Sequence, residues 1–428
     1  MRLAVIADDL TGANDTGVQL VKRGFSTTVC IDPDQAPNGM YEAVVYDTDS
    51  RALPAAKAYA QVKRIAERIR SEWDEQPEIV YKKIDSTMRG RVGAELDAVY
   101  DVFGPDFIVI TPAFPENGRI VREGTLFVNG VPVHETEAGR DTQAPVKESD
   151  VLKLLRRETA RHVALITLED LHLHQEAWQA KLKQFKDEGI VYLVVDATQD
   201  EHLYQAVELF LSTDYRIVWS GSAGLAKALT AFVQPVKSRD HTRFSPIVAN
   251  RILFVVGSTH SRSRRQLDEL LAHPDVSGIE FNIQNRLNEN RSFVDEAVGA
   301  FQIGHHVVLY SSSETVNGDL LLKSGQDRGA VSRAISAQLG TMAARIVEEG
   351  NVDALVMTGG DTAKQVCKML GCAEMELDDE LETGVPIGRL QSDRLGGRTL
   401  YAVTKAGGFG TDSIWIQVLQ YFGGGNRA

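Results

Sequence analysis

The sequence has few cysteines and no long apolar run. Its three cysteines, Cys30, Cys367 and Cys372, have no framework spacing and are too few for a zinc site, which favours a reducing compartment. No apolar run approaches the roughly 18 residues that a membrane helix needs, and no cationic stretch followed by an apolar region marks a signal peptide. We therefore predict a cytoplasmic protein with no membrane partner.

An excess of positive charge is also missing. The formal net charge is −13 and the pI is about 5.3, which disfavours nucleic acids and anionic membranes as partners. An anionic small substrate must then be held by a local basic cluster. The length of 428 residues and the hydrophobic content of 43% predict an ordinary globular chain of more than one domain, which is compatible with a homo-oligomer.

Several familiar catalytic patterns are absent. The chain contains no G-x-x-x-x-G-K-[ST] phosphate loop, no G-x-G-x-x-G dinucleotide fingerprint and no set of protein-kinase motifs. It also lacks H-E-x-x-H and the G-x-S-x-G elbow. These absences exclude the commonest nucleotide, zinc-protease and serine-hydrolase sites, so any nucleotide must be held in another way.

Short β-branched runs alternate with helical patterns along the whole chain. This alternation predicts an α/β fold of two domains, each a mostly parallel sheet flanked by helices, with an active site in the cleft between them. A polar segment with two prolines separates the two halves. We predict domains at 1–235 and 250–428, joined by a linker at 236–249. The clearest predicted strands are 3–7, 26–31, 42–47, 78–84, 107–111, 163–167, 190–197, 216–221, 252–258, 306–312, 354–360 and 399–408.

One segment of the first half, 111–146, shows neither the strand pattern nor the helical pattern of apolar residues. It is predicted to be a long, mostly irregular insertion, although FVNGVPV carries an Asn-Gly hairpin signal. His134 within it is a candidate base, but a histidine in a loop more often has a hydrogen-bonding role.

Three carboxylates follow the first predicted strand, in ADDLTGAND. Polar groups at the carboxyl end of a buried strand are typical of ligand sites in open α/β sheets. Asp8, Asp9 and Asp15 are therefore candidates to bind hydroxyls, to act as a base or to hold a cation. The alternative is that one of them only caps the following helix, which needs a single acceptor.

A cluster of cations follows another predicted strand, in VYKKIDSTMRGRVG. Lys82, Lys83 and Arg89 lie close to Asp85, at a strand exit, and suit a carboxylate or a phosphate. Strand alternation places the two lysines on opposite faces, so only one of them faces the site easily. Arg51, after a third strand, is a further candidate to bind a carboxylate. A charged surface turn is the alternative interpretation.

Three glycine-rich turns follow predicted strands in the second half. They are VVGS ending at Ser258, GGDT at Gly359–Thr362, and KAGG, which contains Gly407 and Gly408. Glycines that free backbone N–H groups at a helix start make phosphate sites, so together the turns favour a nucleotide polyphosphate. Asp361 is a candidate magnesium ligand or a plain helix cap.

Taken together, these motifs resemble the four-carbon acid sugar kinases. The resemblance rests on IADDLTGANDTG, YKKIDSTMRG, TPAFPENGR, VNGVPVHETE, GGDTA and KAGGFG, in the family's order from residue 1 to about 415. It implies a sugar-acid domain followed by an ATP domain, with phosphoryl transfer to the terminal C4 hydroxyl. LTGANDTGVQ is most similar to members that act on D-threonate, whereas AGRDTQAPV departs from the expected FARDPLNPV. The resemblance implies substrate contacts at Asp9, Arg51, Lys82, Lys83, Ile84 and Asp85, and ATP contacts at Ser258, Gly359, Gly360, Asp361, Thr362 and Gly407.

We therefore predict an ATP-dependent kinase of a four-carbon sugar acid, with Mg²⁺ expected alongside ATP. Either Asp9 or Asp85 would align or deprotonate the attacking hydroxyl, and the sequence does not choose between them. Alternatives are a kinase for D-erythronate, L-threonate or 3-oxo-tetronate, a metal-dependent sugar-acid lyase that uses Asp8 and Asp9, and a non-catalytic sensor.

Overall fold

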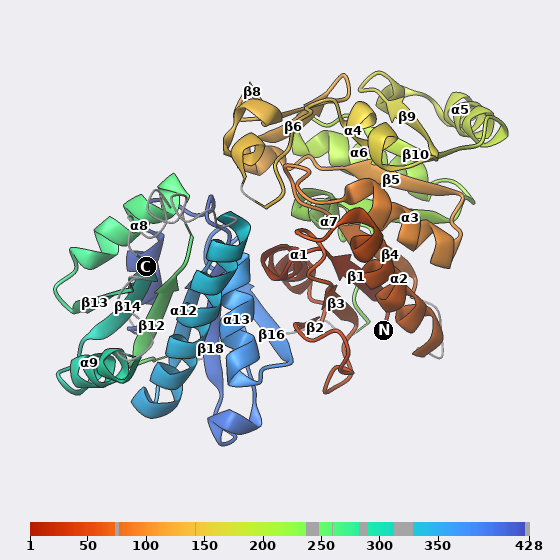
Figure 1. The fold of residues 1–428 in the computed structure, drawn as a ribbon. Helices are drawn as coiled ribbons and strands as arrows, with labels where there is room; N and C mark the ends of the chain where they lie inside the picture. Colours follow the sequence, from red (N-terminus) through yellow and green to blue (C-terminus); the bar gives the residue numbers. More distant parts are fainter. Residues whose placement is uncertain are drawn as a thin grey trace. The chain divides into compact units, whose positions relative to one another are not determined.

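The structure is a computed structural model of the 428-residue chain. It describes residues 1–72, 77–141, 143–236, 248–258, 260–281, 290–311 and 328–423. Contacts divide the chain into two compact units (Figure 1). The first contains Met1–Thr27 and Pro37–Arg239, and the second contains Thr28–Ala36 and Asp240–Ala428. The short segment Thr28–Ala36 thus groups with the second unit, whereas most of the predicted linker, at 237–247, lies outside the described residues.

The first unit is built on a parallel sheet. Its strand order is β3-β1-β4-β11-β5-β10-β9, and neighbouring strands in this order are parallel. The central strands are buried on both faces, as expected for the near-continuous apolar runs that predicted them. The strand bounds are β1 Leu3–Ala7, β3 Ala43–Asp47, β4 Ile79–Lys83, β5 Phe107–Thr111, β9 His162–Ile166, β10 Ile190–Val195 and β11 Ile217–Gly221.

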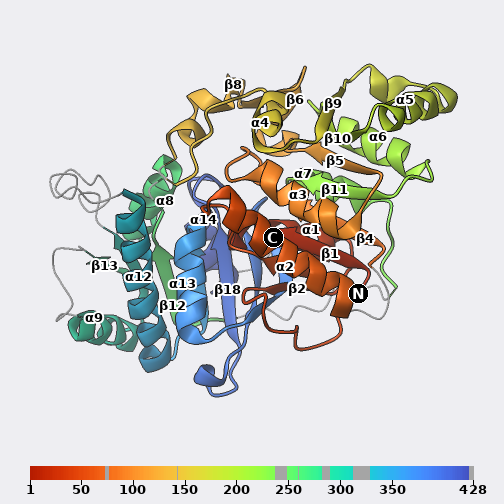
Figure 2. The same ribbon diagram turned by 45° about the vertical axis from the view of Figure 1, so that its right-hand side comes forward.

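Helices cover both faces of this sheet. In Figures 1 and 2, α2 and α3 lie side by side, and α1 packs against α7. The bounds are α1 Leu10–Lys22, α2 Ala55–Glu72, α3 Val92–Phe103, α4 Val151–Glu158, α5 Gln175–Asp187, α6 Asp200–Leu211 and α7 Ala223–Leu229, with a short 3-10 turn at Asp170–His172. The alternation of strand and crossing helix brings the carboxyl ends of the strands to one edge.

The segment predicted to be irregular contains a small antiparallel sheet. Its strands are β6 Arg119–Arg122, β7 Thr125–Val128 and β8 Val131–Pro132, flanked by 3-10 turns at Pro115–Asn117, Val133–Glu135 and Glu137–Arg140. The predicted hairpin is confirmed, because β7 and β8 pair across Asn129 and Gly130, whose φ angles of 51° and 81° suit these two residue types. Nδ1 of His134 lies 2.7 Å from Oγ of Ser149, so its ring takes part in a hydrogen bond.

The second unit has a mixed sheet. The order is β13-β14-β12-β15-β18-β17-β16-β2, parallel as far as β18 and antiparallel beyond it. Residues 28–30 of β2 pair with β16, which explains why this early segment groups with the second unit. The bounds are β2 Thr27–Cys30, β12 Ile252–Val256, β13 Val276–Phe281, β14 His306–Ser311, β15 Ala354–Thr358, β16 Glu374–Glu380, β17 Pro386–Leu390 and β18 Leu400–Lys405.

Alternate side chains of these strands pack under different helices. Phe254 of β12 packs edge to face against Trp415 of α14, in a core that also contains Leu267 of α8. The helix α12 packs against both α9 and α13, which lie beside it in Figures 1 and 2. The bounds are α8 Ser261–Leu271, α9 Asn290–Gln302, α12 Arg328–Gly350, α13 Gly360–Leu370 and α14 Ile414–Phe422, with a 3-10 turn at Asp393–Leu395. Among the described helices, none combines the length and apolar composition needed to cross a bilayer.

Candidate active site

In the first unit, several strands end at the same level. The register pairs Ala7 with Asp47 on one side and with Lys83 on the other, and Lys83 with Gly221. The residues that follow these strands therefore emerge at one edge of the sheet. This edge carries Asp8, Asp9, Arg51 and the segment 84–89, which is the arrangement that the sequence predicts for a ligand site.

Arg51 joins the two adjacent aspartates. Its Nε and Nη2 donate to Asp8 at 2.8 and 3.0 Å, and its Nη1 and Nη2 donate to Asp9 at 2.7 and 2.6 Å. Asp9 also accepts a hydrogen bond from the backbone N–H of Gly12 at 2.9 Å, as the N-cap of α1. Asp9 is therefore the cap of α1 and also lies at the edge that carries the candidate site.

Asp85 is a third carboxylate near this guanidinium. Its Oδ1 is 3.8 Å from Nη2 of Arg51, while Arg89 donates to it twice, from Nε at 2.8 Å and Nη2 at 2.9 Å. Arg89 continues to Asp141, which accepts from its Nη1 at 3.2 Å. The chain of alternating charges thus reaches the segment after HETE, where the sequence departs from the family pattern.

The two adjacent lysines have different partners, as strand alternation predicts. Nζ of Lys82 forms a fully buried ion pair with Oε2 of Glu95 at 2.7 Å. Nζ of Lys83 donates to the carbonyl of Ile84 at 2.9 Å. A Cβ on Gly12 would lie 2.6 Å from this ammonium and 2.7 Å from Oδ1 of Asp9, so the missing side chain lets Lys83 approach the start of α1.

Burial and charge separate the three carboxyl groups. Burial alone would raise the pKa of all three. Arg51 and Lys82 outweigh this effect at Asp8 and lower its pKa, and Arg89 with Arg51 holds the pKa of Asp85 well below its usual range. At Asp9 burial prevails, helped by the negative charge of Asp8, and the pKa is raised.

The exposed fraction of the side chain also distinguishes Asp9 from the other two carboxyl groups. The side chain of Asp9 is 17% exposed, that of Asp85 is 10% exposed and that of Asp8 is 3% exposed. Asp9 is thus the most accessible of the three and the one that binds a proton most readily.

Not every predicted substrate residue presents its side chain at this edge. The ammonium of Lys82 is occupied by Glu95, and Ile84 is fully buried, so its main-chain carbonyl is the group that meets Lys83. Sequence reasoning missed Glu95 and Asp141, which come from α3 and from the insertion. The only available signal was their position near other motifs, because nothing local marks a distant ion-pair partner.

In the second unit, the three predicted glycine turns meet one another. A Cβ on Gly257 would overlap with Oγ1 of Thr362, and one on Gly407 would overlap with Oγ of Ser258. A Cβ on Gly359, whose φ is 97°, would lie 3.5 Å from the backbone nitrogen of Ser258. The turns are therefore packed closely enough to bind one ligand together, and glycine is needed for that approach.

The start of α13 supplies N–H groups to this cluster. Gly359 is the residue before the helix, and Gly360, Asp361 and Thr362 form its first turn. Gly408 lies against the ring of His260, because a Cβ there would be 3.0 Å from its Nε2. Glycine backbone atoms beside a helix start are the arrangement that commonly binds phosphate groups.

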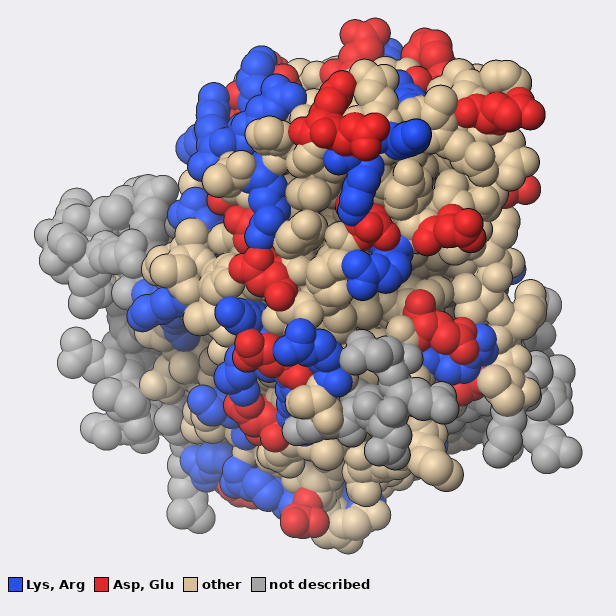
Figure 3. Space-filling view, turned by 90° about the vertical axis from the view of Figure 1, so that its right-hand side faces the viewer, with Lys and Arg blue, Asp and Glu red and all other residues tan. Residues whose placement is uncertain are grey.

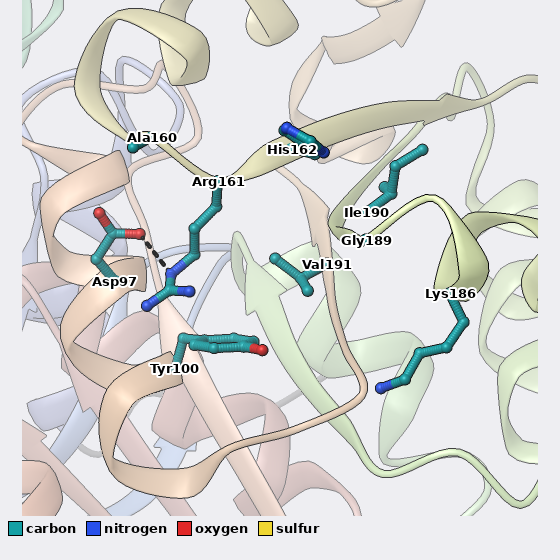
Figure 4. A pocket seen from close by; sticks show the side chains of 9 residues that line it. All are labelled: Asp97, Tyr100, Ala160, Arg161, His162, Lys186, Gly189, Ile190 and Val191. Atoms are coloured by element: carbon teal, nitrogen blue, oxygen red, sulfur yellow. Dashed lines mark hydrogen bonds and ion pairs between the residues drawn. The ribbon is translucent and has the colours of Figure 1, made fainter.

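A pocket of about 610 Å³ lies elsewhere in the first unit (Figure 4). It adjoins the amino ends of β9 and β10, at the opposite edge of the sheet from Asp9. Arg161 lies over the ring of Tyr100, 3.9 Å from its centroid, and pairs with Asp97 at 3.2 Å. Nζ of Lys186 is 2.6 Å from Asp106. Because its cations already have carboxylate partners, we assign no ligand to this pocket.

Acidic and basic side chains are interspersed over most of the face in Figure 3, which is typical of a solvated surface. Within the described residues, no group of three or more His, Cys, Asp and Glu side chains is arranged to hold a metal ion.

Comparisons with known proteins agree with this division. Residues 3–229 match the model of a sugar-binding N-terminal domain, and residues 253–414 match that of a nucleotide-binding C-terminal domain. A D-threonate kinase of Salmonella typhimurium is 32% identical, with 98% of each chain covered. A D-erythronate kinase of Heliobacterium modesticaldum is 30% identical, covering 91% of this chain and 90% of the other.

One further relative and one solved structure are also similar to this chain. A 3-oxo-tetronate kinase of Methylobacterium radiotolerans is 28% identical, covering 90% of this chain and 92% of the other. A solved structure from Salmonella typhimurium, described as a putative tRNA synthase, has the same fold, with a TM-score of 0.79, 23% identity and coverage of 98% and 99%. The chain therefore belongs to the family of four-carbon acid sugar kinases, which combine a sugar-binding N-terminal domain with a nucleotide-binding C-terminal domain.

Proposed function

We propose that this protein transfers the γ-phosphoryl group of ATP to the terminal C4 hydroxyl of a four-carbon sugar acid. The favoured substrate is D-threonate, which would give D-threonate 4-phosphate. The observation that carries the proposal is the group of Asp9, Arg51 and Lys83 at one sheet edge of a unit that matches a sugar-binding domain. The named relatives support the class of acceptor, because each acts on a four-carbon acid.

Lys83 is the best candidate to bind the anionic part of the substrate. Among the described residues, no carboxylate forms an ion pair with it, whereas Lys82, Arg51 and Arg89 each have one. A substrate carboxylate or the transferring phosphoryl group would supply the missing negative charge. Arg51 and Arg89 would then orient the carboxylates of the site and contribute positive charge around the reacting groups.

Asp9 is our choice for the residue that aligns or deprotonates the attacking hydroxyl. It has the raised pKa and the greater exposure, whereas Asp85 has a lowered pKa and is held by Arg89 and Thr87. A general base works best when its pKa is nearer to the operating pH. Phosphoryl transfer otherwise depends mostly on positioning and charge stabilisation, which the ion-pair network would provide.

The second unit would hold ATP at its three glycine turns. Ser258, Gly359–Thr362, Gly407 and Gly408 would contact it, mainly through backbone groups. Magnesium, when bound with ATP, neutralises phosphate charge, and Asp361 is the carboxylate in the first turn of α13. A cytoplasmic location is part of the proposal, supported by three buried cysteines that are free thiols.

Release of ADP tests the proposal directly. A coupled assay with ATP and magnesium should show turnover with D-threonate. The same assay is run with D-erythronate, L-threonate, L-erythronate and 3-oxo-tetronate for comparison. Turnover with another of these acids alone would keep the kinase and overturn the choice of substrate. No turnover with any of them, by a protein that is folded by circular dichroism, would overturn the proposed function.

A further inference from the structure

A buried lysine ends the last strand of the second unit. Lys405 pairs with Thr358 of β15, and its main-chain carbonyl accepts a hydrogen bond from Gly359 at 3.2 Å. Its side chain is 1% exposed. Lys405 therefore connects two of the three glycine turns. It is the first residue of the KAGG turn, and its carbonyl accepts the hydrogen bond from Gly359 of the GGDT turn.

The ammonium of Lys405 is surrounded by neutral acceptors. Nζ donates to the carbonyls of Ala406 at 3.0 Å and Gly407 at 3.4 Å. The hydroxyls of Ser263 and Thr358 each lie 3.4 Å away, and the ring of Trp415 lies 5.1 Å away at its centroid. Among the described residues, no carboxylate forms an ion pair with this ammonium.

Such an environment is unfavourable for a lone cation. Burial lowers the pKa of Lys405 to about 7, and the positive charge of Arg262 adds to the effect, against a weaker pull from Glu382. A buried charge normally has an opposite charge beside it. Here the neighbouring feature is the cluster of glycine turns that fits phosphates, which suggests that the partner is an anionic ligand.

The hydrogen bonds also fix the direction of the turn. The hydroxyl of Ser263 donates to the carbonyl of Gly407 at 2.8 Å. This carbonyl therefore accepts hydrogen bonds from both Ser263 and the ammonium of Lys405. With the carbonyls of Ala406 and Gly407 held towards Lys405, the peptide N–H groups of the turn are constrained as well. A peptide unit is planar, and fixing one end of it orients the other.

We propose that Lys405 is a positioning residue of the nucleotide site, which orients the 406–408 turn from within the unit and supplies the positive charge beneath the polyphosphate. This rests on the proposed use of ATP. The consequence is specific: the charge should favour the phosphates and not the nucleoside. A residue needed only for folding would affect both parts of the nucleotide.

The test compares the binding of ATP and of adenosine by calorimetry, in the full chain. Lys405→Met removes the charge, and Lys405→Gln removes it but keeps a hydrogen-bond donor. Both variants should bind ATP at least about 10-fold more weakly and adenosine within about 2-fold of the wild type. Lys368→Met, at an exposed lysine of α13, is the matched control and should bind both ligands as the wild type does.

Three results would overturn the inference. If the variants bound ATP and adenosine more weakly by the same factor, Lys405 would be a structural residue. If their affinity for ATP were unchanged, the charge of Lys405 would have no role in the site. Wild-type ATP affinity in Lys405→Gln alone would leave only the hydrogen bonds and contradict the proposed role of the charge. If the wild type itself bound no ATP, the proposed function would fail first, which distinguishes the two failures.

Discussion

Asp8, Asp9 and Asp85 surround one guanidinium, yet their environments give them different chemistry. Asp8 is buried and doubly bonded to Arg51, and Asp85 is held by Arg89. Asp9 alone has a raised pKa. Charge, burial and accessibility are therefore the reasons why we propose Asp9, and not Asp8 or Asp85, as the residue that meets the substrate hydroxyl.

Replacing Asp9 with Asn should remove the base and keep the fold. Asn caps helices about as well as Asp, so α1 should still begin at Leu10. We expect kcat to fall by about 10²- to 10⁴-fold, the usual range for the loss of a general base.

The matched control for this change is Asp150→Asn. Asp150 is likewise an N-cap, accepting from the N–H of Lys153 at 2.9 Å, but in α4 and away from the site. Steady-state kinetics should show near wild-type kcat for Asp150→Asn. A near-normal kcat for Asp9→Asn would remove Asp9 from the mechanism.

Asp85 should contribute to the acid sensitivity of the protein. Its pKa is lower in the folded chain than in the unfolded one, so it stabilises the fold above about pH 4, and this stability is lost as the pH falls through the folded pKa. In Asp85→Asn, the unfolding free energy should therefore fall less steeply than in the wild type as the pH drops below about 4. The two slopes should differ by up to ~1.4 kcal/mol per pH unit.

Urea unfolding at a series of pH values measures this slope. Asp187→Asn, at an exposed aspartate at the end of α5, is the control and should leave the slope unchanged. An unchanged slope in Asp85→Asn would mean that the Arg89 contact does not hold the charged carboxylate in solution.

At the scale of helices and strands, α1 depends on a glycine that a helix would not otherwise favour. Alanine usually stabilises a helix by up to about 1 kcal/mol relative to glycine. At Gly12, however, a Cβ would displace the ends of two side chains, those of Lys83 and Asp9. Gly12→Ala should therefore reduce kcat/KM for the acid by at least about 10-fold, with little change in thermal stability.

Gly299→Ala is the matched control for this variant. Gly299 lies within α9, and a Cβ there would meet nothing within 4 Å. Kinetics and thermal denaturation should show normal activity for Gly299→Ala. If Gly12→Ala were fully active, the close approach of Lys83 to α1 would have no role in catalysis.

Most strands of the two large sheets could be predicted from the sequence, whereas β13, β16 and β17 could not. Apolar runs such as LAVIA and FIVIT identify strands that are buried on both faces, and they match β1 and β5. The sequence of β16, EMELDDE, looks too acidic for a strand. It is accommodated because Asp378 is buried against Arg389 of β17, which donates to it twice at 2.8 Å. Such a partner is known only once the two strands are paired.

The location of the candidate site could be predicted from the sequence, but the ion pairs within it could not. Motifs at strand ends indicated Asp9, Arg51 and Lys83 correctly as neighbours, because parallel strands end at one edge. The partner of Lys82, Glu95, and the partner of Arg89, Asp141, come from other elements, and Asp141 is 52 residues from Arg89. Contacts of this kind depend on tertiary packing, which local patterns do not contain.

At the scale of the whole molecule, each unit should govern one substrate. A Cβ at Gly407 would overlap with the hydroxyl of Ser258, between two of the glycine turns. Gly407→Ala should therefore raise the KM for ATP by about 10-fold or more and leave the KM for the acid within about 2-fold. Initial rates with each substrate varied in turn measure the two constants. Equal effects on both would contradict the assignment of ATP to the second unit.

In the proposed reaction, ATP phosphorylates the terminal hydroxyl of the acid. Proton-coupled ³¹P NMR of the product formed from D-threonate shows which hydroxyl is phosphorylated. A phosphate on C4 is coupled to two methylene protons, so we expect a phosphomonoester signal split into a triplet, with ADP formed in equal amount. A doublet, which indicates a phosphate on C2 or C3, or the appearance of inorganic phosphate alone, would contradict it.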